Sequence, residues 1–147
     1  MPSPGEKPCA FLRYDMDLHT AKSNMKPQHI LIVDDEAVIR DMMADLLDLE
    51  GYAVELARNG REALTILQEA GPDAGYLIFL DLMMPVMDGY EFCAYLHSDP
   101  AQRQRHTIVI MSALDHLARA TSLHADASMS KPFNVDDIID IIQTYMQ

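Results

Sequence analysis

Three short segments of this 147-residue chain consist almost entirely of apolar side chains. They are HILIV at residues 29–33, YLIFL at residues 76–80 and TIVIM at residues 107–111. A strand with one face in water alternates polar and apolar residues, whereas a strand buried on both faces is apolar throughout. The three runs therefore predict the central strands of a sheet that is covered on both sides.

Segments with helical spacing separate these runs. Apolar residues recur at helical intervals in residues 38–47, 61–70, 89–96 and 114–124, and again after Asn134, which we expect to cap the last helix. Weaker strand signals at residues 52–56 and 127–130 complete the pattern. Five strands alternating with five helices predict an α/β fold: a doubly wound, five-stranded parallel sheet with helices on both faces.

The charge balance restricts the partners that such a domain can have. The formal net charge is -12, and so acidic a chain repels phosphate backbones and anionic lipids, which argues against a nucleic-acid partner. No apolar run approaches the ~20 residues of a membrane span, and the first residues lack the apolar core of a signal peptide. The two cysteines, Cys9 and Cys93, are too few for a disulfide framework. We therefore expect a cytoplasmic protein without membrane insertion.

Residues 1–28 differ in character from the remainder of the chain. They contain scattered charges and three early prolines without any sustained periodicity, and their net charge is +1 against -13 for residues 29–147. We interpret them as a mostly disordered N-terminal arm that precedes one domain at residues 29–147.

Polar side chains stand where the predicted strands end. Asp34, Asp35 and Glu36 follow the first strand, Asp81 and Ser112 follow two others, and Lys131 follows the last. In open α/β sheets, ligands bind beyond the carboxyl ends of the strands, where the strand order reverses. Several carboxylates in one place repel each other unless a pKa rises or a cation such as Mg²⁺ binds.

A single acid at the end of a strand is common and needs no function. The presence of Lys131 beside several acids makes it less credible that these residues stand together by chance. It is the only lysine in residues 29–147. A compact ammonium suits a point contact with an anionic group. Acids and an amine together indicate a functional site.

Four short motifs carry a family resemblance. VDDE at residues 33–36, DLMMPVMDG at 81–89, MSA at 111–113 and SKPF at 130–133 occur in this order on the predicted strands. Together they resemble the receiver domain of response regulators over roughly residues 29–147. The resemblance implies a flavodoxin-like fold with strand order 2-1-3-4-5.

The resemblance also implies a role for each matching residue. Asp81 is similar to the phosphoacceptor, and Asp34, Asp35, Asp81 and the backbone carbonyl of Met83 to the ligands of Mg²⁺. Ser112 and Lys131 correspond to the hydroxyl and the amine that contact the phosphoryl group, and the small Ala113 leaves space for that group. Pro132 matches a proline that follows a cis peptide bond.

Two features depart from the family pattern, and both concern the surface that passes the signal on to a partner (the output). The position three residues before Lys131 holds Ser128, where the family usually has an aromatic switch residue. The interval from Ser112 to Lys131 is also shorter than usual. We therefore expect output by partner binding at residues 114–124, residues 127–130 and the last helix, without an aromatic rotamer switch.

We interpret the chain as a single-domain response regulator that is phosphorylated by a sensor histidine kinase or a histidine phosphotransfer protein. It is then a switch, not an enzyme, with slow autodephosphorylation because Met83 and Leu114 flank the site with apolar side chains. An alternative is a phosphorelay intermediate that passes the group on to a histidine phosphotransfer protein. A hydrolase of the haloacid-dehalogenase type requires a second aspartate where Met83 stands, and a binding module without phosphorylation leaves the complete site unexplained.

Overall fold

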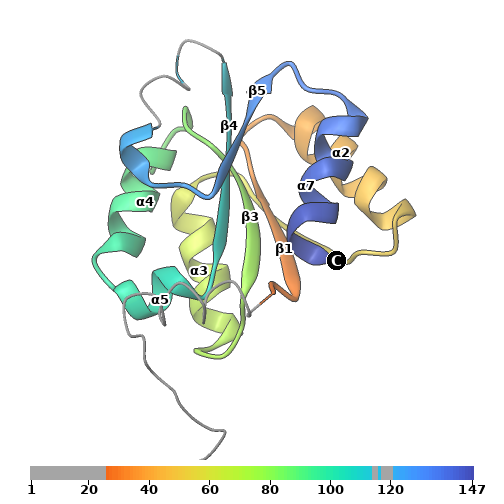
Figure 1. The fold of residues 1–147 in the computed structure, drawn as a ribbon. Coiled ribbons are helices and arrows are strands. Elements are labelled where there is room, and N and C mark those ends of the chain that lie inside the picture. The colour runs from red at the N-terminus through yellow and green to blue at the C-terminus, as the bar shows by residue number, and fades with distance from the viewer. Residues whose placement is uncertain (1–25, 114–115, 117–120) are drawn as a thin grey trace, which may run out of the picture.

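The computed structural model describes residues 26–113, 116 and 121–147. Its helices and strands alternate along the chain (Figure 1). The strands are β1 (His29–Val33), β2 (Val54–Ala57), β3 (Tyr76–Asp81), β4 (Thr107–Ala113) and β5 (Ala127–Lys131). The helices are α2 (Ala37–Leu49), α3 (Gly60–Ala70), α4 (Gly89–His97), α5 (Pro100–Gln104), the short 3-10 helix η1 (Thr121–Leu123) and α7 (Val135–Met146).

The strands form one parallel sheet in the order β2-β1-β3-β4-β5, which confirms the predicted topology. Strands β1, β3 and β4 are its three inner strands, and β3 is buried at every residue. An apolar run without alternation is what a strand packed on both faces requires.

Two apolar cores lie on opposite faces of the sheet. Alternate residues of the inner strands pack against α3 and α4 on one face, with Leu67 and Phe92 among the buried side chains. The intervening residues pack against α2 and α7 on the other face, where Leu47 and Ile138 are buried. Figure 1 shows the two helical layers with the sheet between them.

Side-chain caps fix where the helices begin. The side chain of Asn134 accepts a hydrogen bond from the backbone N–H of Asp137, and the carboxylate of Asp137 accepts one from the backbone N–H of Asn134, so the predicted cap of the last helix is confirmed. Asp88 and Glu91 form the same reciprocal arrangement at α4. Each cap satisfies backbone N–H groups that lack a partner within the helix.

The structure differs from the sequence prediction at α5. The sequence suggests only a helix end at Asp99-Pro100, whereas Asp99 caps a new short helix with Pro100 at its first position. Proline suits that position because its missing N–H would have no helical partner there. Within the predicted helix at residues 114–124, residues 121–123 form η1, and residues 114–115 and 117–120 lie outside the described residues.

The predicted arm also lies mostly outside the described residues, which begin at Lys26. Pro27 is buried, and the backbone N–H of Gln28 donates to the carbonyl of Gly75 over 3.1 Å. Among the described residues, no helix has both the length and the apolar character needed to cross a bilayer.

Candidate phosphorylation site

The site lies at the carboxyl edge of the sheet, where parallel strands end side by side. Asp34 directly follows β1, Asp81 ends β3 and Lys131 ends β5. Ser112 lies near the end of β4, in register with Ser130, and Ala113 pairs with Lys131. The topology therefore brings together residues that are up to 97 positions apart in the chain.

Three carboxylates form the acidic part of the site. One oxygen from each of Asp34, Asp35 and Asp81 can be chosen so that all three lie within 4.8 Å of one another. Asp34 and Asp81 are buried and Asp35 is exposed. Within the described residues, these three form the only cluster of histidine, cysteine or acidic side chains with a spacing that suits a metal ion.

The ammonium of Lys131 lies between the acids. Its Nζ is 2.7 Å from Oδ2 of Asp34 and 3.5 Å from Oδ2 of Asp81. The more exposed Glu36 lies 3.6 Å away. Burial acts to lower the pKa of Lys131, but the hydrogen bond and the negative charges of Asp34, Asp81 and Glu36 outweigh it and raise that pKa. Lys131 is therefore a firmly protonated cation at this site.

The pKa of Asp81 departs far from that of an ordinary aspartate. Burial, with the charge of Asp34 next, raises its pKa to about 6. Lys131 and a hydrogen bond from the backbone N–H of Met83 act in the opposite direction and do not cancel these effects. A carboxylate in this environment carries an unfavourable charge that a cation would relieve.

The loop after Asp81 folds closely against it. Gly89 donates from its backbone N–H to the carbonyl of Leu82 over 3.0 Å. A Cβ at Gly89 would lie 2.5 Å from the backbone oxygen of Asp81, so only glycine fits without moving the loop. Val86, at the tip of the loop, has a left-handed backbone with φ 71, which is rare for a β-branched residue.

The other predicted site residues have differing exposure. Ser112 is buried, Ala113 is exposed at the strand end, and the Met83 side chain is also exposed. The peptide bond between Lys131 and Pro132 is cis, as the resemblance implies. Leu114 lies outside the described residues.

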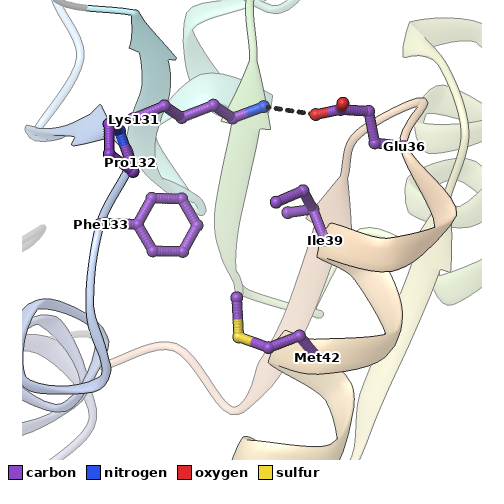
Figure 2. A pocket seen from close by; sticks show the side chains of 6 residues that line it. All are labelled: Glu36, Ile39, Met42, Lys131, Pro132 and Phe133. Atoms are coloured by element: carbon purple, nitrogen blue, oxygen red, sulfur yellow. Dashed lines mark ion pairs between the residues drawn. The ribbon is translucent and has the colours of Figure 1, made fainter.

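A pocket of about 330 Å³ adjoins the site between α2 and the segment after β5. Figure 2 shows Lys131 and Glu36 facing each other across its rim, above the apolar side chains of Ile39, Met42 and Phe133. The acidic site thus borders an apolar surface on the α2 side of the sheet.

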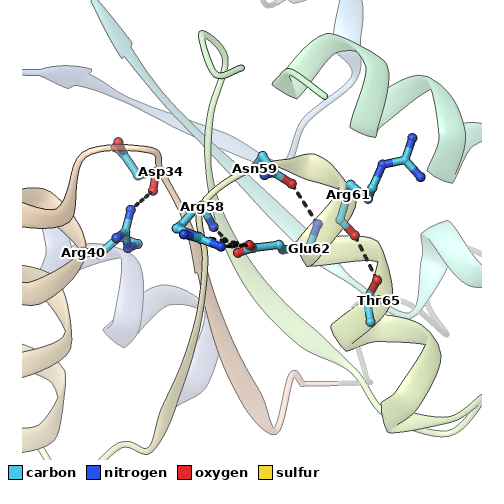
Figure 3. Close-up of polar contacts among 7 residues, drawn as sticks. All are labelled: Asp34, Arg40, Arg58, Asn59, Arg61, Glu62 and Thr65. Atoms are coloured by element: carbon cyan, nitrogen blue, oxygen red, sulfur yellow. Dashed lines mark hydrogen bonds and ion pairs between the residues drawn. The ribbon is translucent and has the colours of Figure 1, made fainter. Parts of the chain in front are cut away.

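Sequence reasoning missed Arg40. Its guanidinium Nη1 donates to the backbone carbonyl of Asp34 over 2.7 Å (Figure 3). The only signal in the sequence is a basic residue within two turns of the acidic motif, and a contact with a backbone carbonyl leaves no pattern of paired charges.

Comparison with known proteins agrees with this geometry. The model of the response regulator receiver domain matches residues 30–143. The alkaline phosphatase synthesis transcriptional regulatory protein SphR of Synechococcus elongatus is 40% identical over 121 residues, which cover 75% of this chain and 45% of SphR. The chain thus spans about half the length of such relatives.

Solved structures share the fold. The chemotaxis protein CheY4 of Vibrio cholerae has a TM-score of 0.68 at 30% identity, with 81% of this chain and 98% of that chain covered. The receiver domain of sensor histidine kinase PA1611 from Pseudomonas aeruginosa has a TM-score of 0.69 at 25% identity, with 82% and 98% covered, and holds a magnesium ion in its active-site cleft. This chain belongs to the response regulator receiver domain family, whose members act as phosphoacceptor switches in two-component signal transduction.

Proposed function

We propose that this domain is a phosphorylation switch in which Asp81 accepts a phosphoryl group from the phosphohistidine of a sensor histidine kinase or a histidine phosphotransfer protein. The observation that carries the proposal is the arrangement of Asp34, Asp35 and Asp81 around a possible cation position, with the Lys131 ammonium 3.5 Å from Asp81. A lone buried carboxylate would repel an incoming phosphoryl group, whereas this arrangement offsets the charge.

The transfer step is simple in covalent terms. A carboxylate oxygen of Asp81 attacks phosphorus, a P–O bond forms, and the P–N bond of the phosphohistidine breaks. The electron pair of that bond returns to the imidazole nitrogen, and the product is an acyl phosphate on Asp81. Positioning and charge stabilisation account for most of the catalysis in such transfers. In our proposal the Lys131 ammonium and the Ser112 hydroxyl bind phosphoryl oxygens.

The donor set fits Mg²⁺. Carboxylate oxygens are the hard ligands that this ion prefers, and the exposure of Asp35 leaves one side open to water and phosphoryl oxygens. We assign Asp34, Asp35, Asp81 and the backbone carbonyl of Met83 as the residues that hold it. When bound, the ion supplies positive charge that offsets the repulsion between Asp81 and the phosphoryl group.

Intact-mass measurement with a small-molecule phosphodonor tests the proposal. After incubation with acetyl phosphate and Mg²⁺, we expect one added phosphoryl group on the wild type, and none on Asp81→Asn or in the presence of a chelator. Asp88→Asn is the control, because Asp88 lies in the same loop but caps α4. Undiminished labelling of Asp81→Asn would exclude Asp81 as the acceptor.

The lifetime of the acyl phosphate gives a further prediction. Met83 lies two residues after Asp81 and its exposed thioether offers an attacking water little beyond a weak acceptor. We expect Met83→Asn to accelerate autodephosphorylation about fivefold, since one added hydrogen bond is worth about 1 kcal/mol. The measurement is the decay of the phosphorylated mass, with Met83→Leu as the apolar control. Equal decay in all three proteins would show that this position does not control water.

We further propose that output occurs through partner binding at residues 114–124, β5 and α7. The exposed Ser128 on β5 cannot supply the bulky ring of an aromatic switch. Amide exchange with and without beryllofluoride, a phosphoryl mimic, should show altered protection on β5 and α7. Changes confined to the loops at Asp34, Asp81 and Lys131 would place output elsewhere.

A further inference from the structure

We propose that Arg40 is a positioning residue for the magnesium site and controls how tightly the domain binds Mg²⁺. This inference rests on the proposed function, because it concerns the same acidic cluster. The contact that supports it joins Nη1 of Arg40 to the backbone oxygen of Asp34 over 2.7 Å.

Asp34 is fixed at each of its polar groups. Its backbone N–H donates to the carbonyl of Ala57 over 3.1 Å, and its Oδ1 accepts from the backbone N–H of Glu36 over 2.9 Å. Its Oδ2 pairs with Lys131 over 2.7 Å. Arg40 supplies the remaining contact, which is the one at the backbone carbonyl.

The carbonyl of Asp34 belongs to the peptide unit that leads into Asp35, so its orientation determines where the Asp35 carboxylate can point. Asp35 is exposed, and the structure shows no hydrogen bond or ion pair of its carboxylate within the described part of the chain. The backbone therefore has to orient this ligand, and Arg40 holds the backbone at that point.

Neighbouring charges leave Arg40 available for this contact. Glu62, a carboxylate close enough to feel the charge of Arg40, is engaged by Arg58, whose Nε and Nη2 lie 3.0 Å and 2.7 Å from Oε2 of Glu62. The hydrogen bonds from Arg58 lower the pKa of Glu62, with the charge of Arg40 as a minor contribution. Figure 3 shows Arg58 paired with Glu62 and Arg40 directed at Asp34.

If Arg40 acts by positioning, its removal changes the Mg²⁺ affinity in the opposite direction from the change expected if it acts only through its charge. A guanidinium near a divalent cation repels it, so removal of the charge alone would strengthen Mg²⁺ binding. Loss of a positioning contact would weaken binding, because residues that orient metal ligands typically change metal affinity by about 10–100-fold. The sign of the change thus separates the two roles.

Isothermal titration with Mg²⁺ is the test. We expect Arg40→Met to bind Mg²⁺ roughly tenfold more weakly than the wild type. Arg40→Lys keeps the charge but not the planar fork, and we expect it to bind more weakly than the wild type as well. Arg61→Met is the matched control, because it removes one positive charge from an exposed arginine that Figure 3 shows directed away from Asp34. The Mg²⁺ affinity of Arg61→Met should equal that of the wild type.

Urea denaturation in chelator and backbone amide NMR spectra establish that each variant is folded. Chemical-shift changes of Arg40→Met should concentrate at residues 34–36. Equal or tighter Mg²⁺ binding by folded Arg40→Met would overturn the inference while leaving the phosphorylation site intact. Absence of Mg²⁺ binding by the wild type would instead overturn the proposed function.

Discussion

Replacement of Arg103 by methionine is expected to lower the free energy of unfolding by about 3–5 kcal/mol, the usual cost of removing one partner from a buried ion pair. Arg103 is a buried side chain of α5. Its Nη1 donates to the carbonyl of His106 over 2.7 Å, and its Nη2 donates to the carbonyl of His124 and to Oδ2 of Asp126, each over 3.1 Å.

The expected loss of stability in Arg103→Met is large because several acceptor groups receive hydrogen bonds from this one guanidinium. The Asp126 carboxylate, whose side chain is only 20% exposed, accepts from the backbone N–H of Ile108 at 2.9 Å, and without Arg103 it loses its charged donor. Two backbone carbonyls also lose a charged donor, and each such loss carries a desolvation penalty.

Urea denaturation of a double-mutant cycle measures this network. Arg103→Met and Asp126→Asn should each destabilise the protein, and the double variant should lose less than the sum of the two. Arg105→Met is the control, since the ion pairs among the described residues do not include Arg105. Additive losses in the cycle would show that the two side chains act independently.

The free energy of unfolding of the metal-free protein is expected to fall as the pH rises from about 4 to 6, and to do so because of Asp81. The folded-state pKa of about 6 lies above the ordinary aspartate pKa of 3.8, so the folded state binds a proton more tightly than the unfolded state. The cost of ionising Asp81 is therefore small below about pH 4 and complete only above about pH 7. It amounts to roughly 2–3 kcal/mol at 1.36 kcal/mol per pKa unit.

Asp81→Asn removes this cost with little change in shape. In chelator at pH 8, we expect the variant to be more stable than the wild type by roughly 2–3 kcal/mol, with the difference vanishing only below about pH 4. Saturating Mg²⁺ should reduce the difference in the free energy of unfolding between the two proteins at pH 8, because Mg²⁺ binding stabilises the wild type. Asp73→Asn, at an exposed loop position, is the control. A wild type that is as stable as the variant at every pH would contradict the assigned pKa.

The sequence predicted those features that depend on the residues of a single helix or strand. The apolar runs predicted the inner strands β1, β3 and β4, and the strand order implied by the resemblance is confirmed. Asp34, Asp81 and Lys131 could be placed together because parallel strands end at one edge. These inferences need only the periodicity of each segment and the rule for where ligands bind.

Contacts between distant segments could not be predicted in the same way. Helix α5 has five residues, too few to show a helical period, and its Arg103 pairs with Asp126 across 23 positions. Arg40 binds a carbonyl, and every residue has a carbonyl, so no side-chain pattern identifies the acceptor. Such contacts depend on tertiary geometry and not on local sequence.

The ion pair between Asp34 and Lys131 closes a span of 97 positions across a sheet in which β3 and β4 separate the two strands that precede these residues. The two side chains meet only when β1, β3, β4 and β5 lie in this order, because β3 and β4 set the distance between β1 and β5. A polypeptide cut at the exposed turn after Gly71 would carry the two residues on different fragments. Phosphorylation that returns when the two fragments are mixed would therefore measure the fraction of molecules in which β1 has paired again with the strands of the second fragment.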